Sequence, residues 1–198
     1  MSKQIKDYIA KTNSIGNDLF LLQDASDNAY KKITGTNLAN FITATVVTNK
    51  YIQLLDLKSD NSHGGSATAG SWLSRDLNTI ANDDTGSVVL SNNLFVLPAG
   101  TYIANIQIPF EVTGRTRCRL RNTTDGTDIL YSSSEYFQTG NGSSGHCFIK
   151  GKFTIASNKS LQVQYRCNTS QASFGLGNAT GFGSPNEIFT IVELSKIS

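Results

Sequence analysis

From residue 51 onward, short runs of alternating apolar and polar residues recur about every ten residues, separated by glycine-bearing turns. The alternation is clearest in 102–108 (YIANIQI) and 161–165 (LQVQY). Because successive side chains of a strand point to opposite faces, this pattern indicates strands with one buried face. Many short strands at this spacing predict an antiparallel β-sandwich or barrel. The expected strands are 51–57, 72–77, 87–90, 94–97, 101–110, 115–121, 128–136, 146–155, 160–167 and 187–195.

Composition supports a mainly β chain. Ser, Thr and Asn account for 60 of the 198 residues, whereas charged residues make up 16% and aromatic residues 9%. Ser, Thr and Asn are weak helix formers that favour turns and the polar faces of sheets, which excludes a helical bundle. The aromatic and branched residues are too many for a disordered chain. Polar loops rich in Gly, Ser and Asn are expected at 59–71, 138–145 and 168–186.

Residues 1–50 have a different pattern and predict a small N-terminal module with a connector. Residues 18–22 and 30–33 indicate a hairpin, and Thr34 or Thr36 would cap a short helix after it. Residues 1–12 could form a further short helix, and 43–50 form an extended connector. One hairpin and one helix cannot hold a stable core alone, so we expect the module to pack on the next domain, on copies of itself or on a larger assembly. Its apolar positions are Leu19, Phe20, Leu21, Leu22, Tyr30, Ile33, Leu38 and Phe41.

The charge distribution argues against two classes of partner. The formal net charge is +2, and residues 51–198 hold eleven basic and eleven acidic side chains. No basic domain is available to follow a phosphate backbone, so we expect no nucleic-acid partner. No apolar run reaches the length of a membrane helix, and the N-terminus has no apolar stretch of a secretory signal. The three cysteines are therefore expected to be reduced and buried.

Metal and catalytic motifs are weak in this sequence. No His or Cys pair has zinc-site spacing, and His146 and Cys147 should point to opposite faces of a strand. The segment 83–86 (DDTG) contains the tripeptide of aspartic proteases once, and a turn is the favoured interpretation. Calcium binding by Asp83 and Asp84 stays open. We expect no cofactor and no bound metal.

A glycosidase would need two converging carboxyl groups. Glu111 and Glu135 lie near strand ends, but nothing in the sequence brings them together. Nucleophile-elbow, P-loop and dinucleotide-binding motifs are absent. The favoured interpretation is that the protein is not an enzyme.

Two features could contact a ligand. The segment 115–121 (RTRCRLR) places four arginines on one face of a strand, with Cys118 and Leu120 facing the core. Such a row could hold an acidic glycan or carboxylate, or it could be an exposed face that pairs with acidic groups of a neighbouring chain. Aromatic residues in glycine-rich loops could serve binding or subunit packing. The candidate contact residues are Arg115, Arg117, Arg119, Arg121, Tyr136, Phe174 and Phe182.

Two stretches of the chain resemble bacteriophage proteins. Residues 18–24 (DLFLLQD) and 30–38 (YKKITGTNL) resemble a short module near the start of phage tail and fibre proteins. Residues 54–195 resemble the C-terminal head of phage fibres, which is similar in strand plan to the jelly rolls of tumour necrosis factor and the complement globular heads. The matching strings are 54–58 (LLDLK), 70–78 (GSWLSRDLN), 95–102 (FVLPAGTY) and 119–127 (RLRNTTDGT).

The resemblance implies a homotrimer whose heads pack around a three-fold axis. It implies a virion protein, assembled in the bacterial cytoplasm, whose N-terminal module binds other capsid or tail proteins and whose head attaches to a bacterial surface glycan or protein. Unlike typical tail fibres, the chain has almost no shaft between 1–50 and 51–198, so a short fibre or a purely structural capsid decoration both fit its length. A glycan-processing enzyme is a third alternative. The apolar run expected near the trimer axis comprises Ile188, Phe189, Ile191, Val192 and Leu194.

Overall fold

The structure is a computed structural model that describes residues 19–23, 30–34, 49–140, 142–183 and 186–198. The chain divides into two compact units, Met1–Thr48 and Asn49–Ser198. In the first unit, β1 (Leu19–Gln23) pairs antiparallel with β2 (Tyr30–Thr34), with Leu19 opposite Thr34 and Gln23 opposite Tyr30. This pairing confirms the predicted hairpin. The two predicted helices, including the one with Leu38 and Phe41, lie outside the described residues.

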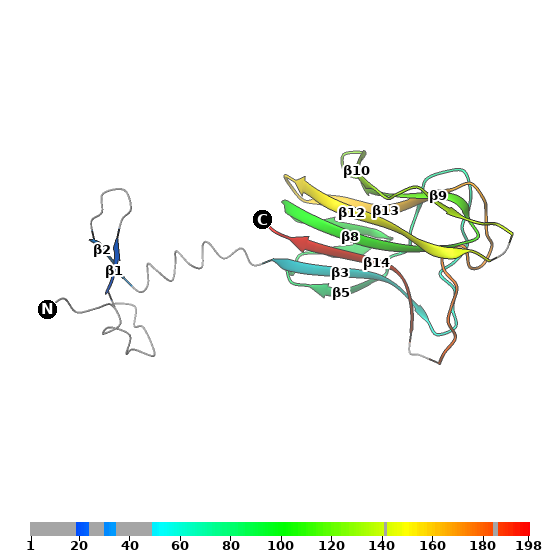
Figure 1. Cartoon of the computed structure of the whole chain (residues 1–198), viewed down its shortest axis with the longest axis horizontal. Coiled ribbons are helices and arrows are strands. Elements are labelled where there is room, and N and C mark those ends of the chain that lie inside the picture. The colour runs from blue at the N-terminus through cyan, green and yellow to red at the C-terminus, as the bar shows by residue number, and fades with distance from the viewer. Residues whose placement is uncertain (1–18, 24–29, 35–48, 141, 184–185) are drawn as a thin grey trace. The chain divides into compact units, whose positions relative to one another are not determined.

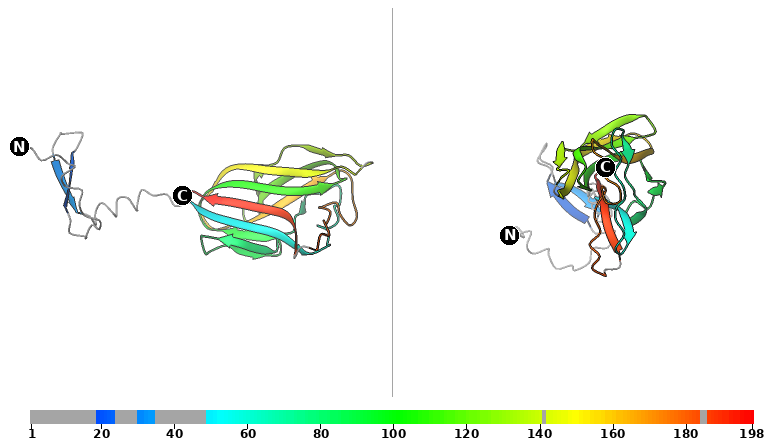
Figure 2. Two further views of the ribbon diagram at one scale, coloured as in Figure 1. Left: turned by 60° about the horizontal axis from the view of Figure 1, so that its bottom comes forward. Right: turned by 90° about the vertical axis from the view of Figure 1, so that its right-hand side faces the viewer.

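The second unit is a sandwich of two antiparallel sheets, as Figures 1 and 2 show. One sheet has five strands in the order β12-β8-β14-β3-β5, and we call it the five-stranded sheet. The other, the seven-stranded sheet, has the order β10-β9-β13-β7-β6, with β11 paired to β9 and β4 paired to β13. The strands are β3 (Lys50–Ser59), β4 (Leu73–Ser74), β5 (Thr79–Asp83), β6 (Val89–Ser91), β7 (Leu94–Leu97), β8 (Gly100–Glu111), β9 (Gly114–Asn122), β10 (Thr127–Tyr131), β11 (Glu135–Phe137), β12 (Ser144–Ile155), β13 (Lys159–Cys167) and β14 (Asn186–Lys196).

The core lies between the two sheets and is built by the alternation seen in the sequence. On β9, Cys118 and Leu120 are fully buried, while the arginines that alternate with the buried residues point outward. On β8, Tyr102 is fully buried and stacks on Phe153 with ring centroids 5.3 Å apart. Its hydroxyl donates to the Pro98 carbonyl at 2.7 Å, so the Tyr102 side chain closes the corner that leads from β7 into β8. The mainly β sandwich predicted for this part of the chain is therefore confirmed.

The three cysteines are free and buried, as expected. Burial raises the pKa of the Cys118 thiol well above its usual value, with a smaller contribution from Cys147. The same alternation places Cys147 inside and His146 outside on β12. Within the described residues, no helix is long and apolar enough to cross a membrane.

Three strand predictions were wrong in detail. The stretch 72–77 contributes only the two residues of β4, because the backbone and side chains after Ser74 enter a polar network instead. Residues 79–83 form β5, where no strand was predicted. The stretch 128–136 divides into β10 and β11, with a register shift between Asp128 and Leu130.

The prediction that the apolar run of β14 faces a trimer axis needs correction. The strand is the middle of the five-stranded sheet, between β8 and β3. Phe189, Val192 and Leu194 point into the sandwich core and are at most 5% exposed, so they cannot contact another copy. On the outer face, Ile188 is 51% exposed and Ile191 is half-buried. The run is apolar mainly because a central strand needs a buried face.

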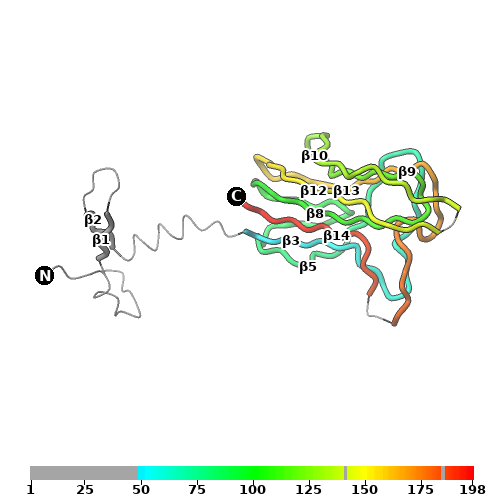
Figure 3. The backbone as a smooth tube through the Cα atoms, in the orientation of Figure 1, coloured from blue at the N-terminus to red at the C-terminus, as the bar shows by residue number. Residues whose placement is uncertain are grey.

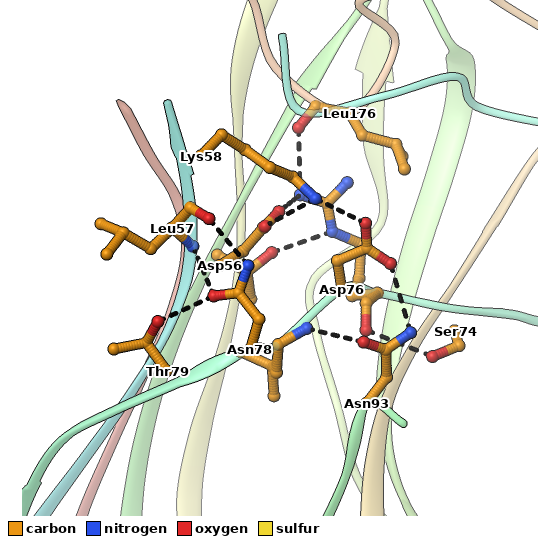
Figure 4. A network of polar contacts seen from close by, with 12 residues as sticks. Asp56, Leu57, Lys58, Ser74, Asp76, Asn78, Thr79, Asn93 and Leu176 are labelled. Atoms are coloured by element: carbon orange, nitrogen blue, oxygen red, sulfur yellow. Dashed lines mark hydrogen bonds and ion pairs between the residues drawn. The ribbon is translucent and has the colours of Figure 1, made fainter. Parts of the chain in front are cut away.

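A buried ionic network closes one side of the sandwich (Figure 4). Arg75 is fully buried, and its Nε donates to Thr190 Oγ1 at 2.9 Å while Nη2 donates to the Leu176 carbonyl at 3.0 Å. Asp56 is also fully buried, with Oδ2 4.0 Å from Arg75 Nη2 and Oδ1 3.2 Å from Lys58 Nζ. Neither Asp56 oxygen accepts a well-formed hydrogen bond. Burial raises the pKa of Asp56, against the opposing charges of Lys58 and Arg75.

The loops at one end of the sandwich are tied to each other. The Gly64 N–H donates to the Gly177 carbonyl at 2.9 Å, and Ala67 and Gln171 exchange two backbone hydrogen bonds. A Cβ on Gly64 would lie 2.4 Å from the Leu176 carbonyl oxygen, which explains the glycine at this close approach. The strand β3 begins at the opposite end of the sandwich, near the C-terminus (Figure 3), and its first residue, Lys50, pairs with Lys196 of β14.

Candidate functional site

The predicted arginine row lies on the outer face of the seven-stranded sheet. Arg115 and Arg117 are exposed, and Arg119 and Arg121 are partly covered, while the residues between them are buried. The neighbouring strand β13 adds Arg166 to the same face, directly opposite Arg117 in the register. Five guanidinium groups therefore share one side of the sheet.

One half of this row is neutralised within the chain. Arg119 Nη1 lies 2.9 Å from Asp128 Oδ2, and Arg121 Nη1 lies 2.7 Å from Asp128 Oδ1. Arg119 also donates to Gln164 Oε1 at 2.8 Å. Burial opposes ionisation of Asp128, but the hydrogen bond from Tyr131 and the pair with Arg121 hold the pKa of Asp128 below its usual value. This half of the row is a closed polar network.

The other half has no carboxylate partner. Among the described residues, no carboxylate oxygen lies within 4.0 Å of Arg115, Arg117 or Arg166. Residues directly opposite in an antiparallel pair have Cβ atoms about 4.5–5.5 Å apart, and like charges placed so destabilise the sheet. The cross-strand pair of Arg117 and Arg166 is such a like-charge pair. In the described part of the chain, a cation–π contact of Arg117 with the Tyr131 ring, at 4.8 Å, offsets part of this repulsion.

These unpaired arginines line a surface groove of about 640 Å³. The aromatic side chains of Trp72 and Tyr136 lie in the same groove, and Tyr136 is 63% exposed. Arg119 lies over the Trp72 ring at 4.3 Å and thereby connects the neutralised half of the row to the groove. The lining residues are Trp72, Arg115, Thr116, Arg117, Ser134, Glu135, Tyr136, Arg166, Cys167 and Asn168.

The floor of the groove is held by backbone contacts at the start of β9. The Arg115 N–H donates to Asn168 Oδ1 at 2.6 Å, and the Asn168 N–H donates to the Arg115 carbonyl at 3.1 Å. Gly114 has φ +66, and a Cβ there would lie 2.2 Å from Asn168 Oδ1. Both the left-handed backbone and the close approach therefore require glycine. The groove lies at the end of the sandwich opposite to residue 50, next to the tied loops.

The structure brings together three of the predicted contact residues, Arg115, Arg117 and Tyr136. Arg119 and Arg121 are engaged by Asp128 instead. The two loop aromatics lie elsewhere in the described structure. Phe182 is 86% exposed in its loop, and Phe174 is half-buried with its ring 5.9 Å from that of His63.

Sequence reasoning missed Trp72, Arg166 and Asn168 as parts of this site. The alternation of β13 places Arg166 on the outer face, but only the strand order shows that β13 lies beside β9. Trp72 follows the loop 59–71, and the β4–β13 pairing brings the adjacent Leu73 opposite Tyr165. Glu135 lines the groove and accepts a hydrogen bond from Ser133 Oγ at 2.5 Å, whereas Glu111 is not among the lining residues.

The outer face of the five-stranded sheet has a different character. Ile103 on β8 and Phe148 on β12 are 49% and 41% exposed. At the centre of this face, Glu193 accepts hydrogen bonds from the Tyr51 hydroxyl at 2.8 Å and from Asn105 Nδ2 at 2.7 Å. Burial and the bond to Glu193 raise the pKa of Tyr51 to about 12. This face therefore mixes exposed apolar side chains with polar ones at its centre, and its lysines, Lys150 and Lys152, lie on the edge strand β12.

The acidic turn at 83–86 has a structural role in the described chain. Asp83 accepts hydrogen bonds from the Thr85 N–H at 2.9 Å and from the Val88 N–H at 2.9 Å. It therefore fixes the turn between β5 and β6, in agreement with the turn interpretation. The described residues contain no cluster of three or more His, Cys, Asp or Glu side chains that could hold a metal ion.

Comparisons with known proteins define the fold of this unit. No protein-family model matches the chain, and no curated protein sequence matches it. Among solved structures, murine APRIL at pH 5.0 is similar with a TM-score of 0.51 and 12% identity over 75% of this chain and 99% of that chain. The globular domain of zebrafish complement 1qA matches with a TM-score of 0.48 and 12% identity over 76% of this chain and 98% of that one. The likeness to APRIL shows that residues 49–198 have a jelly-roll β-sandwich fold of the tumour necrosis factor type.

Proposed function

We propose that the chain is a short homotrimeric bacteriophage fibre that attaches the virion to the surface of a bacterial host. The observation that carries the proposal is the groove with Arg115, Arg117 and Arg166, none of which has a carboxylate partner among the described residues. The groove lies at the end of the second unit (Asn49–Ser198, here called the head) that is opposite to residue 50. A head held to a particle through its N-terminal side would present this end outward.

Trimer formation is supported by the contrast between the two outer faces of the sandwich. The five-stranded sheet exposes the apolar side chains of Ile103 and Phe148 and carries its exposed lysines on the edge strand β12, whereas the seven-stranded sheet exposes arginines on its inner strands β9 and β13. Subunit interfaces are depleted of charged residues at their centre. We propose that three five-stranded sheets face the three-fold axis. Homotrimers are also typical of the tumour necrosis factor type of jelly roll.

The proposed role of the first unit is attachment to the particle. An isolated two-stranded hairpin is at best marginally stable in water, and the pairing of β1 with β2 is the secondary structure described there. A virion protein of the capsid or tail that packs on this module would supply the missing core.

The trimer is tested by the mass of the full chain in light scattering at micromolar concentration. We expect a mass that corresponds to three copies of the chain, and Ile103→Lys should shift the measured mass toward that of one copy. Val89→Lys is the matched control, because Val89 is 59% exposed on the other sheet. A monomeric parent protein would overturn the trimer proposal.

Attachment is tested with the labelled full-length protein and a panel of bacterial strains. We expect saturable binding to at least one strain, and competition with phage infection of that strain. The three heads of one trimer would raise the avidity well above the affinity of one head. A correctly assembled trimer that binds no strain and does not reduce infection would contradict the attachment role, leaving a purely structural capsid decoration.

A further inference from the structure

We propose that the groove on the seven-stranded sheet binds a saccharide that carries a carboxylate group. Arg117 and Arg166, with Arg115 beside them, would hold the carboxylate, and a sugar ring would pack against Trp72 or Tyr136. This inference rests on the proposed attachment function and gives it a ligand class. The likeness in fold to solved structures does not by itself indicate a ligand.

Charge is the first argument for an anionic ligand. Arg117 and Arg166 are cross-strand neighbours with like charge, and an anion placed between them would relieve their repulsion. On the same sheet, the charges of Arg119 and Arg121 are neutralised by Asp128, which lies 2.9 Å from the first and 2.7 Å from the second. The carboxylate of the ligand would neutralise Arg117 and Arg166 in the way that Asp128 neutralises Arg119 and Arg121.

Geometry favours a carboxylate as the anion. A guanidinium is a planar fork that donates two parallel hydrogen bonds to a planar carboxylate. Glu135 lines the same groove, so three positive charges stand against one negative charge. That balance suits a ligand with isolated single charges better than a dense polyanion. Glu135 could in turn accept hydrogen bonds from sugar hydroxyl groups.

The aromatic side chains and the size of the groove favour a sugar. Its volume of about 640 Å³ lies in the range of small-molecule sites, about 300–1,000 Å³. Exposed Tyr136 and half-buried Trp72 present apolar surface with a polar tip, which is suited to a ring that has both C–H and hydroxyl groups. Nucleic acid is disfavoured, because residues 51–198 hold equal numbers of basic and acidic side chains.

The experiment uses the full-length protein on a printed panel of oligosaccharides. The panel contains uronic-acid and sialic-acid glycans, their methyl esters, and neutral, phosphorylated and sulfated saccharides. We expect binding to at least one carboxylated glycan and loss of that binding in its methyl ester. Binding only to neutral, phosphorylated or sulfated members, or to none, would overturn the proposal.

Matched arginine variants test the position of the site. Arg117→Gln and Arg166→Gln should each weaken binding of the positive glycan by about tenfold or more, because each removes a charge-assisted hydrogen bond. Arg121→Gln, on the same strand but paired with Asp128, should change the affinity by less than about threefold. Equal losses in all three variants would refute the groove as the site.

Stability provides a second measurement on the same variants. Because Arg166→Gln removes a like-charge neighbour of Arg117, its melting temperature should be no lower than that of the parent. A melting temperature lower than that of the parent would contradict the proposed repulsion between Arg117 and Arg166. The attachment and ligand proposals can fail separately: cell binding without carboxylate dependence would reject the ligand class alone, and glycan binding without cell binding would reject the attachment role alone.

Discussion

Replacing Arg75 by methionine should destabilise the head by about 3–5 kcal/mol at pH 7, the range for breaking a buried ion pair. Arg75 and Asp56 are both fully buried, and their charged atoms lie 4.0 Å apart. At an effective dielectric constant of about 20, two unit charges at that distance attract each other by about 4 kcal/mol. Methionine keeps the apolar stem but leaves the Asp56 carboxylate with Lys58 as its remaining cationic contact.

The loss should depend on pH in a defined direction. Burial already raises the pKa of Asp56, so its folded value lies above its unfolded value. For such a group, stability decreases as the pH rises through the interval between the two values, because the folded state binds more protons there. Without Arg75 the interval extends to higher pH. The variant's deficit should therefore be smallest at low pH, where protonation of Asp56 leaves only the lost hydrogen bonds to Thr190 and Leu176, and should increase as the pH rises through the folded pKa of Asp56.

The assay is urea unfolding followed by circular dichroism, at one fixed protein concentration because oligomers unfold in a concentration-dependent way. Asp56→Asn combined with Arg75→Met should recover most of the lost stability, since no charge is then left unpaired. Arg121→Met is the surface control, with an expected loss below about 1 kcal/mol. The reasoning is refuted if Arg75→Met loses less than about 1 kcal/mol at pH 7, or if the double variant is no more stable than the single one.

Three further outcomes follow from buried groups. The three cysteines should not react with a thiol reagent in the native protein and should all react after unfolding, because they are buried and free. The Tyr51 hydroxyl should ionise at about pH 12 in an absorbance titration, and the stability from its bond to Glu193 should be present below about pH 10 and lost between these values. Leu194→Ala should lower the free energy of unfolding by about 2–5 kcal/mol, whereas Val89→Ala should change it by less than about 0.5 kcal/mol in chemical denaturation.

Much of the head could be predicted because its local pattern agrees with its tertiary structure. The outward arginines of β9 and the inward Cys118 and Leu120 follow directly from strand alternation. β5 was missed because Asn82 and Asp83 have low strand propensity, and their place beside β3 depends on tertiary pairing. The apolar run of β14 was assigned to a subunit contact because a sequence does not distinguish a residue buried between two sheets from one buried between two chains.

The candidate site was predictable only in part. Its β9 arginines were found from one strand, but the groove also needs Arg166 and Trp72, which are distant from them in sequence. Which arginines are available could not be predicted either. That depends on Asp128, whose carboxylate reaches Arg119 and Arg121 only because β10 folds back beside β9.

The position at which the chain enters the head also affects how the head bears mechanical load. Residue 50 begins β3, an inner strand whose register runs beside β14 from Lys50–Lys196 to Ser59–Asn186 and which β5 flanks on its other side. A force applied between residue 50 and the loops at the opposite end of the sandwich acts along the length of β3, perpendicular to its hydrogen bonds. The bonds are then strained in shear, so they must break together instead of one after another from an end. We expect the sandwich to resist such a force more strongly than its equilibrium stability alone suggests, because forced unfolding depends on the unfolding rate.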